Sequence, residues 1–168
     1  APDQPELKWA KAGVLERKGD YEGAIAIYED LYKENSGNPI VANNLASLLS
    51  AHGANPDSLN RAELIARRLR GSSVPAFQDT YGWIAYLRGS YDEAEAELVK
   101  AAAGLPEDAS VQYHLAMTYL AQDKQSEALA QFRRMMTLIP PEGPYPDFVA
   151  AAQAEIGKLE AAGITVGN

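Results

Sequence analysis

Residues 89–94 read Gly-Ser-Tyr-Asp-Glu-Ala, and two further stretches of the chain carry the same pattern. Residues 19–24 read Gly-Asp-Tyr-Glu-Gly-Ala, and residues 123–128 read Asp-Lys-Gln-Ser-Glu-Ala, with aspartate in the place of the first glycine. A fourth, looser copy starts at Gly53 and reaches its alanine only at Ala62. The glycines or their stand-ins lie 34, 36 and 34 residues apart. This spacing indicates four copies of a unit of 34 residues.

Each unit predicts a pair of helices joined near the glycine. Before the glycine, apolar residues recur at helical spacing, as at Leu45 and Leu49. After it, alanine and large apolar residues alternate at the same spacing, as at Ala94, Leu98 and Ala101. Two short helices cannot bury both of their faces alone, so neighbouring units must cover the rest. The pattern therefore predicts an all-α repeat protein.

Helix ends are marked by residues with suitable side chains. Three residues stand at expected N-cap positions: Asp20, Ser90 and Asp108. Ser90 and Glu93 also form a capping-box pattern, in which each side chain would cap the other's backbone. Proline follows asparagine at 38–39 and 55–56, near expected first turns. Gly19 and Gly89 end first helices, where a left-handed residue is favoured.

These motifs resemble the tetratricopeptide-repeat (TPR) family. The third unit matches the family pattern at Tyr81-Gly82, Gly89, Tyr91, Ala94, Leu98, Ala101 and Pro106. The fourth matches it at Leu115-Ala116, Tyr119, Ala128, Phe132 and Pro140. The resemblance implies a right-handed α-α superhelix with four helix pairs and a C-terminal capping helix. It places the repeats at about 5–38, 39–74, 75–108 and 109–141, within a single domain over 1–168.

The stretch after the fourth repeat predicts the cap. Residues 141–146 read as a turn, and Asp147 is expected to cap an amphipathic helix over about 147–162. Its apolar stripe is expected at four positions: Phe148, Ala152, Ile156 and Leu159. A stack of repeats exposes apolar surface at its ends, so this helix should shield the last repeat.

The second unit is irregular. Four extra residues fall within 54–58 and should lengthen the turn between its helices or add a turn to the second one, with Pro56 near the new N-terminus. Leu64, Ile65 and Leu69 keep helical spacing and are expected in the core. A cluster of four arginines follows on the expected second helix: Arg61, Arg67, Arg68 and Arg70. It fits either a solvated face paired with Glu63 or a site for an acidic partner.

Composition excludes several classes of function. The formal net charge is −8, which disfavours nucleic acid and anionic membranes as partners, because both attract basic surfaces. No apolar run approaches the roughly 18–20 residues of a membrane-spanning helix, so we expect no direct membrane insertion. The chain begins Ala-Pro-Asp without an initiator Met, which suggests processing or excision from a longer protein.

No pattern typical of catalysis is present. The chain has no cysteine, and His52 and His114 lack a second ligand at metal-binding spacing. Phosphate loops, nucleophile elbows and zinc motifs are missing from the sequence. We therefore expect neither an enzyme nor a bound metal or cofactor.

The TPR resemblance implies a concave groove lined by the first helices of successive units. Projecting the sequence onto that geometry gives the expected lining: Asn43, Asn44, Asp79, Trp83, Tyr86, Tyr113, Met117 and Leu120. These aromatic and apolar side chains would make an exposed docking patch. Alternatively, Trp83 and Tyr86 pack between units. Only Arg17 could supply a cation to the lining, so the carboxylate clamp that binds acidic chaperone C-termini is not expected.

The sequence therefore predicts a scaffold that binds a peptide or a partner's helix in the groove. The alternative is a structural module that forms homo-oligomers within a larger envelope or secretion complex. The strings at 43–46, 79–83 and 111–116 are similar to TPR segments of bacterial exopolysaccharide-export and PEP-CTERM-associated envelope lipoproteins. That narrower resemblance implies a periplasmic or cell-envelope location, with the cytoplasm as the alternative.

Overall fold

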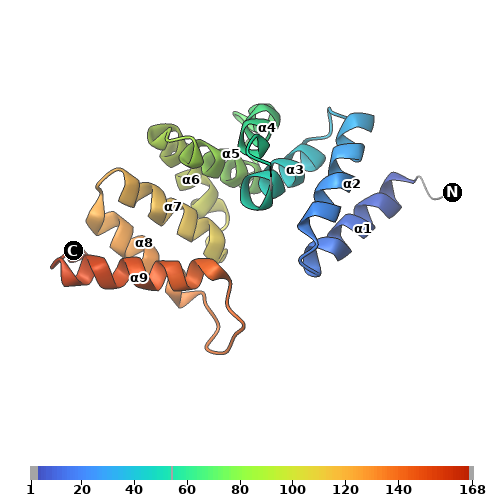
Figure 1. The fold of residues 1–168 in the computed structure, drawn as a ribbon. Coiled ribbons are helices and arrows are strands. Elements are labelled where there is room, and N and C mark those ends of the chain that lie inside the picture. The colour runs from blue at the N-terminus through green and yellow to red at the C-terminus, as the bar shows by residue number, and fades with distance from the viewer. Residues whose placement is uncertain (1–3, 54, 167–168) are drawn as a thin grey trace. The chain divides into compact units, whose positions relative to one another are not determined.

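The computed structural model describes residues 4–53 and 55–166, and every regular element in that part of the chain is a helix (Figure 1). The elements are α1 (Pro5–Arg17), α2 (Tyr21–Glu34), α3 (Pro39–His52), α4 (Ser58–Ala66), the 3-10 helix η1 (Arg67–Leu69), α5 (Pro75–Leu87), α6 (Tyr91–Gly104), α7 (Ala109–Ala121), α8 (Gln125–Thr137) and α9 (Asp147–Ala161). The all-α repeat fold predicted from the sequence is confirmed.

The chain divides between Ser72 and Ser73 into two compact parts. They are called unit 1 and unit 2 from here on, as distinct from the four 34-residue repeats. In unit 1, α1 packs on α2, α2 on α3, and α3 on α4. In unit 2, each helix from α5 to α9 likewise packs on the next along the chain. Each helix thus buries part of its surface against its sequence neighbours, as in other helical repeats.

The expected helix ends are largely present. Gly19 and Gly89 have φ values of +74° and +79°, and Asp123 adopts the same left-handed conformation at +60°. The Asp20 carboxylate accepts a hydrogen bond from the Gly23 N–H at 3.0 Å, so it caps α2 as predicted. Asp108 likewise accepts from two backbone N–H groups at the start of α7.

The capping box predicted at Ser90 is wrong. Ser90 is the N-cap of α6, but its side chain makes no capping hydrogen bond. Glu93 instead accepts a 2.7 Å hydrogen bond from the Tyr81 hydroxyl of α5. A contact between two helices has therefore replaced the local cap.

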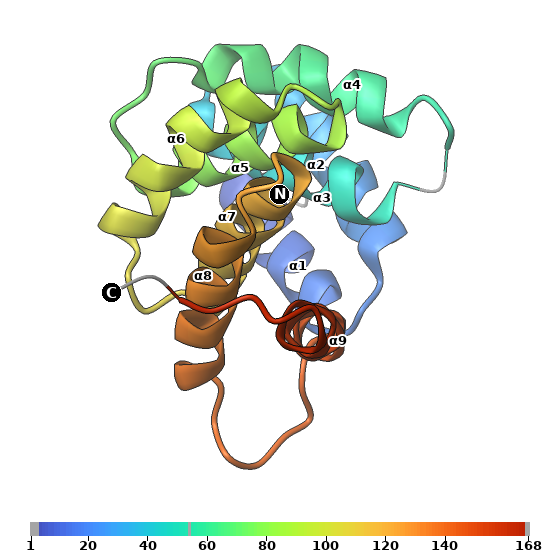
Figure 2. The same ribbon diagram turned by 90° about the vertical axis from the view of Figure 1, so that its left-hand side faces the viewer.

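The C-terminal helix α9 forms, with two corrections. Pro146 rather than Asp147 occupies the N-cap position, because the helix begins at Asp147 itself. The predicted stripe packs on the last repeat, with Ala152 and Leu159 buried and Phe148 and Ile156 partly buried; Val149 is a further buried residue that the prediction lacked. α9, seen end-on in Figure 2, packs on both α7 and α8. It therefore covers the last helix pair.

The irregular second repeat departs from expectation at one core position. Ile65 and Leu69 are buried, but Leu64 is 56% exposed. Residues 62, 65, 66 and 69 form the buried face, and residue 64 lies a quarter-turn or more away from it. The extra residues lengthen the turn before α4, which begins at Ser58, after Pro56; residue 54 of that insertion lies outside the described residues.

Small residues let the paired helices approach closely. A Cβ placed on Gly82 would lie 2.7 Å from Leu98 Cγ of α6, which is shorter than real side chains tolerate. The core of the last repeat is formed by seven buried residues: Ala116, Ala128, Leu129, Phe132, Met135, Ala152 and Leu159. Close packing of this kind is what orients the side chains on the other faces of α5 and α7.

Candidate partner-binding surface

An aromatic stack forms on α5 and α7 of unit 2. The Trp83 ring stacks on Tyr86, one turn later on α5, with centroids 4.6 Å apart and planes 7° apart. It also stacks on the His114 ring of α7, at 4.1 Å and 15°. All three rings are partly exposed. We call Asp79, Trp83, Tyr86, Tyr113 and His114 the aromatic surface.

A hydrogen bond between the two helices holds this stack. His114 Nδ1 donates to Asp79 Oδ1 over 2.8 Å, and the two side chains are 18% and 16% exposed. The His114 ring is therefore fixed from its edge by Asp79 while its face meets Trp83. Sequence reasoning considered His114 only as a metal ligand and missed this role. Its position directly after Tyr113 on the same helix was the available signal.

The predicted residues of α7 are also packing residues. Tyr113, Met117 and Leu120 are partly buried against the core of the last repeat. The Tyr113 ring lies 5.4 Å from Phe148 of α9 and 6.2 Å from Phe132 of α8. Burial, and secondly the charge of Glu155 on α9, raise the pKa of Tyr113. The side chains of α9 thus cover part of the patch that the sequence placed in an open groove.

Tyr86 of α5 is also partly buried. Burial raises the pKa of its hydroxyl, with smaller contributions from Tyr91, Tyr113 and Glu155. The Tyr91 ring, at the start of α6, lies 5.6 Å from the Tyr86 ring and is 37% exposed. Tyr91 therefore extends the aromatic surface, although the sequence analysis used it only as a family match.

Asn43 and Asn44 lie in unit 1, where they belong to a polar network. The Tyr28 hydroxyl donates to Glu16 at 2.9 Å and accepts from Asn44 Nδ2 at 3.2 Å. Asn43 Nδ2 in turn donates to Asn44 Oδ1 at 3.2 Å. The burial of Tyr28, together with Glu16, raises the pKa of its hydroxyl to about 12.

This network limits what Asn43 can offer a ligand. Asn43 was predicted to line the groove, but its Nδ2 already donates a hydrogen bond to Asn44. Among the described residues, its Oδ1 is buried and has no hydrogen-bond partner. Asn43 is therefore oriented inward.

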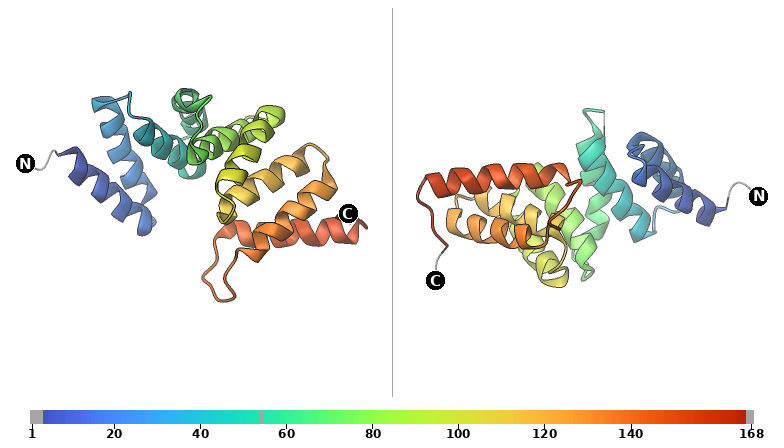
Figure 3. Two further views of the ribbon diagram at one scale, coloured as in Figure 1. Left: turned by 180° about the vertical axis from the view of Figure 1, so that it is seen from behind. Right: turned by 90° about the horizontal axis from the view of Figure 1, so that it is seen from below.

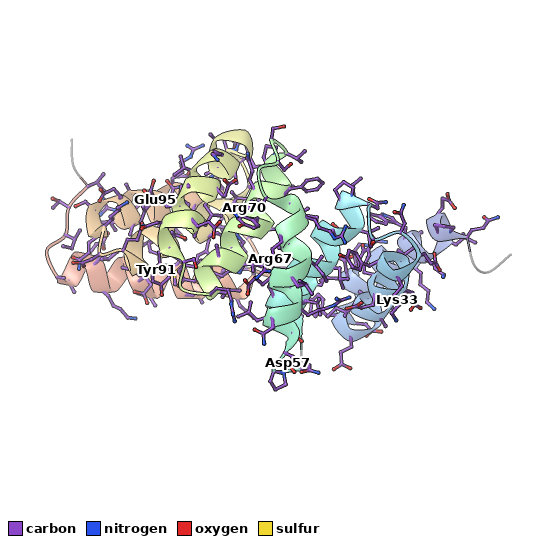
Figure 4. The ribbon with its side chains drawn as sticks, turned by 90° about the horizontal axis from the view of Figure 1, so that it is seen from above. Lys33, Asp57, Arg67, Arg70, Tyr91 and Glu95 are labelled. Carbon is purple, nitrogen blue, oxygen red and sulfur yellow. The ribbon has the colours of Figure 1, made fainter. Side chains whose placement is uncertain are left out.

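The arginine cluster is largely engaged in contacts of its own. Arg61 forms a two-pronged hydrogen bond to Glu29, at 3.2 and 3.0 Å, and lies over the Tyr32 ring. Arg67 pairs with Glu63 at 3.2 Å, as predicted. The expectation of one second helix is wrong, because Arg67 and Arg68 belong to η1 and Arg70 follows it (Figure 4). After α4 the chain tightens into the 3-10 helix η1.

Two further findings concern the described residues as a whole. No group of three or more His, Asp or Glu side chains among them is arranged to hold a metal ion. Within the same residues, none of the helices combines the length and the apolar character that crossing a membrane requires.

Comparison with known proteins identifies the fold. No family model and no curated protein matches the chain. Among solved structures, it resembles TTC0263, a thermophilic TPR protein in Thermus thermophilus, with a TM-score of 0.69, 20% identity, and coverage of 92% of this chain and 82% of that one. MamA 41-end from Desulfovibrio magneticus RS-1 gives a TM-score of 0.61 at 19% identity, covering 95% and 94%. A further MamA structure gives 0.66 at 18%, covering 95% and 83%. The chain therefore has the fold of a tetratricopeptide-repeat protein.

Proposed function

We propose that the chain is a protein-interaction scaffold and that its aromatic surface binds a peptide or a helix of a partner. The observation that carries this proposal is the partly exposed Trp83 ring, stacked on both Tyr86 and His114. Large aromatic side chains dominate the energetics of many protein interfaces, because they offer wide contact areas with few rotatable bonds.

The surface is also pre-organised. Asp79 and His114 join α5 to α7 through a hydrogen bond, so Trp83 stacks on a His114 ring that is already fixed. A partner would therefore lose little side-chain entropy on this side of the interface. Met117, one helical turn after Tyr113 on α7, adds an adaptable and partly exposed apolar side chain.

The test begins with a displayed random-peptide library selected on the full chain. The affinity of a selected peptide is then measured by calorimetry. Trp83→Ala should weaken binding by about 2 kcal/mol or more if Trp83 is a hot spot. Tyr145→Ala is the matched control, because Tyr145 is an aromatic residue that is 47% exposed in the loop before α9. Unchanged affinity in Trp83→Ala, with loss in Arg67→Ala/Arg68→Ala, would move the site to the arginines.

Self-assembly is the second candidate, and one observation favours it. Leu7 and Val14 lie on the same face of α1 and are 55% and 39% exposed. Burying them against a second copy would be favourable. Light scattering over a range of concentrations tests this: a monomer at every concentration would reject self-assembly. A role in exopolysaccharide export and an envelope location stay predictions from the sequence.

A further inference from the structure

Unit 1 contains a cavity of about 400 Å³ between its first three helices. Its lining comes from the start of α1, the end of α2 with the turn that follows, and the start of α3, which are the blue to cyan helices of Figure 3. A volume of this size lies within the range of pockets that hold small ligands. The cavity shares no residue with the aromatic surface of unit 2.

One part of the lining is apolar and aromatic. Leu31 of α2 and Val41 of α3 are buried side chains that border the cavity. Trp9 of α1 borders it as well and is partly buried. The Trp9 ring packs edge-to-face on Tyr28, with centroids 5.4 Å apart and planes at 81°, so a neighbouring helix holds the indole in place.

The exposed part of the lining is acidic. Glu6 of α1 and Glu34 of α2 are exposed and border the cavity, whereas no lysine, arginine or histidine of the described residues does. Glu34 pairs with Lys8, which lies outside the lining. In residues 4–53 and 55–166, Glu6 forms no ion pair and no hydrogen bond. The cavity therefore offers a ligand one carboxylate that the chain itself leaves unused.

Two asparagines complete the lining, and their oxygens are already engaged. Asn35 Oδ1 accepts a hydrogen bond from the Gly37 N–H at 3.2 Å, and Asn38 Oδ1 accepts from the Ile40 N–H at 3.0 Å. Each side chain keeps an amide nitrogen, which can donate to a peptide carbonyl. The side-chain acceptors left for a ligand are thus the carboxylates.

We propose that this cavity binds an arginine side chain of a partner protein. The guanidinium group is planar and weakly hydrated, and it both stacks on aromatic rings and forms paired hydrogen bonds to a carboxylate. The cavity sets Trp9 and the Glu6 carboxylate around one space, and tryptophan is the aromatic residue that attracts cations most strongly. The carbon chain of the arginine would lie against Leu31 and Val41. Lysine fits less well, because its ammonium group is more strongly hydrated.

Other occupants match the lining less well. An acidic side chain would be repelled by Glu6 and Glu34. A purely apolar side chain would remove water from these carboxylates without replacing its hydrogen bonds. A second copy of the chain is a weaker source of arginine, because several of its arginines are already paired with its own carboxylates: Arg61, Arg67, Arg133 and Arg134.

The probe is Nα-acetyl-arginine amide, titrated into the full chain labelled with nitrogen-15. The chain has two tryptophans, so Trp83→Phe assigns the two indole N–H signals in the NMR spectrum. We expect a saturable shift of the Trp9 signal and an unchanged Trp83 signal. A single side chain makes few contacts, so the dissociation constant should be on the order of millimolar.

Matched changes in the chain and in the probe locate the site. Glu6→Gln should weaken binding by about threefold or more, through loss of the ion pair. Glu22→Gln, the same change at an exposed position in the first turn of α2, should leave binding unchanged. The citrulline analogue of the probe has the same shape without the charge and should bind about tenfold more weakly. Circular dichroism checks that each variant keeps its helices.

Several results would overturn the proposal. The Trp9 signal could show no saturable shift, the citrulline probe could bind as well as the arginine probe, or Glu6→Gln could have no more effect than Glu22→Gln. Binding only by a chain that lacks residues 1–3 would assign the cavity to the chain's own N-terminus. A dimer that the arginine probe dissociates would assign it to a second copy. Trp83→Ala should bind the probe normally, so this outcome is separate from that of the aromatic surface.

Discussion

Units 1 and 2 use equivalent helix positions for different chemistry. The ninth residue of the first helix is Ser47 in α3 but Trp83 in α5. Unit 1 builds a polar network around Tyr28, whereas unit 2 builds an aromatic stack around Trp83. The eighth residue is alanine or glycine in both units, because a second helix packs on it. Packing thus constrains one face of each first helix and leaves another free to carry binding residues.

Charge separates the units as well. Residues 1–72 hold nine cationic and ten anionic side chains, whereas residues 73–168 hold six and thirteen. Nearly all of the net negative charge is therefore on unit 2. Repulsion between like charges disfavours acidic segments as partners of its aromatic surface. This agrees with the absence of a carboxylate clamp from the projected lining.

The largest effect is expected from deleting residues 145–168, which removes α9. Val149 and Leu159 are buried against α7 and α8, so the deletion uncovers a core that includes Phe132. Each large side chain exposed costs roughly 1.5–3 kcal/mol. The chain has one tryptophan in each unit, Trp9 in unit 1 and Trp83 in unit 2. In a Trp9→Phe background, Trp83 fluorescence therefore reports the unfolding of unit 2. In a Trp83→Phe background, Trp9 fluorescence reports that of unit 1. We expect the deletion to lower the melting temperature reported by Trp83 markedly and to leave that reported by Trp9 unchanged. An unchanged Trp83 melting temperature would refute the capping role of α9.

The next effect concerns the close approach of α5 and α6. Gly82→Val places side-chain atoms where Leu98 lies, so unit 2 should lose about 1–3 kcal/mol of unfolding free energy. Urea unfolding measures the loss, followed by Trp83 fluorescence in the Trp9→Phe background for unit 2 and by Trp9 fluorescence in the Trp83→Phe background for unit 1. Gly13→Val in α1 is the control for the change of residue, because a Cβ at Gly13 would meet only the far end of the Arg17 side chain. Equal losses in both variants would show that helix propensity, not packing, is responsible.

Unit 1 should lose stability in alkali through Tyr28. Its hydroxyl has a pKa of about 12, against an ordinary 10 in the unfolded chain. The folded state therefore holds its proton more tightly. The resulting stability is complete below pH 10 and is lost as the pH rises toward 12, by up to about 2 kcal/mol.

Urea unfolding at pH 9 and pH 11, followed by Trp9 fluorescence in Trp83→Phe, measures this loss. Tyr28→Phe should be less stable at pH 9, since Asn44 and Glu16 lose their shared partner. Its further loss between the two pH values should be smaller. If the wild type and Tyr28→Phe lost the same stability between pH 9 and pH 11, Tyr28 would not be the source of the alkali sensitivity.

The smallest effect should stabilise the protein. Gly157 lies at an exposed position within α9, where an added Cβ meets nothing within 4 Å. Gly157→Ala should raise the free energy of unfolding of unit 2 by about 0.5–1 kcal/mol, because alanine favours the helix. Thermal unfolding measures the shift. A destabilised Gly157→Ala variant would mean that another part of the chain lies against this position.

The repeat pattern in the sequence predicted most of the fold. The spacing of glycine and alanine predicted the helix pairs, and Asp20 and Asp108 cap helices as expected. Less of the candidate site could be predicted from the sequence. Trp83 and Tyr86 were projected from helix periodicity, but the hydrogen bond between Asp79 and His114 joins residues 35 positions apart. The position of His114 directly after Tyr113 was the available signal for its place on α7, but no local pattern marks its pairing with Asp79.

The sequence by itself determined where the helices lie and which residues must be small, because both depend on local spacing and on a unit repeated four times. Only the tertiary structure decided how much of each side chain is covered. In the folded chain Glu93 accepts a hydrogen bond from Tyr81 instead of capping α6, Leu64 is exposed, and Phe148 lies beside Tyr113. These outcomes depend on the angle and distance between helices, which are set by packing over the whole core rather than by neighbours along the chain.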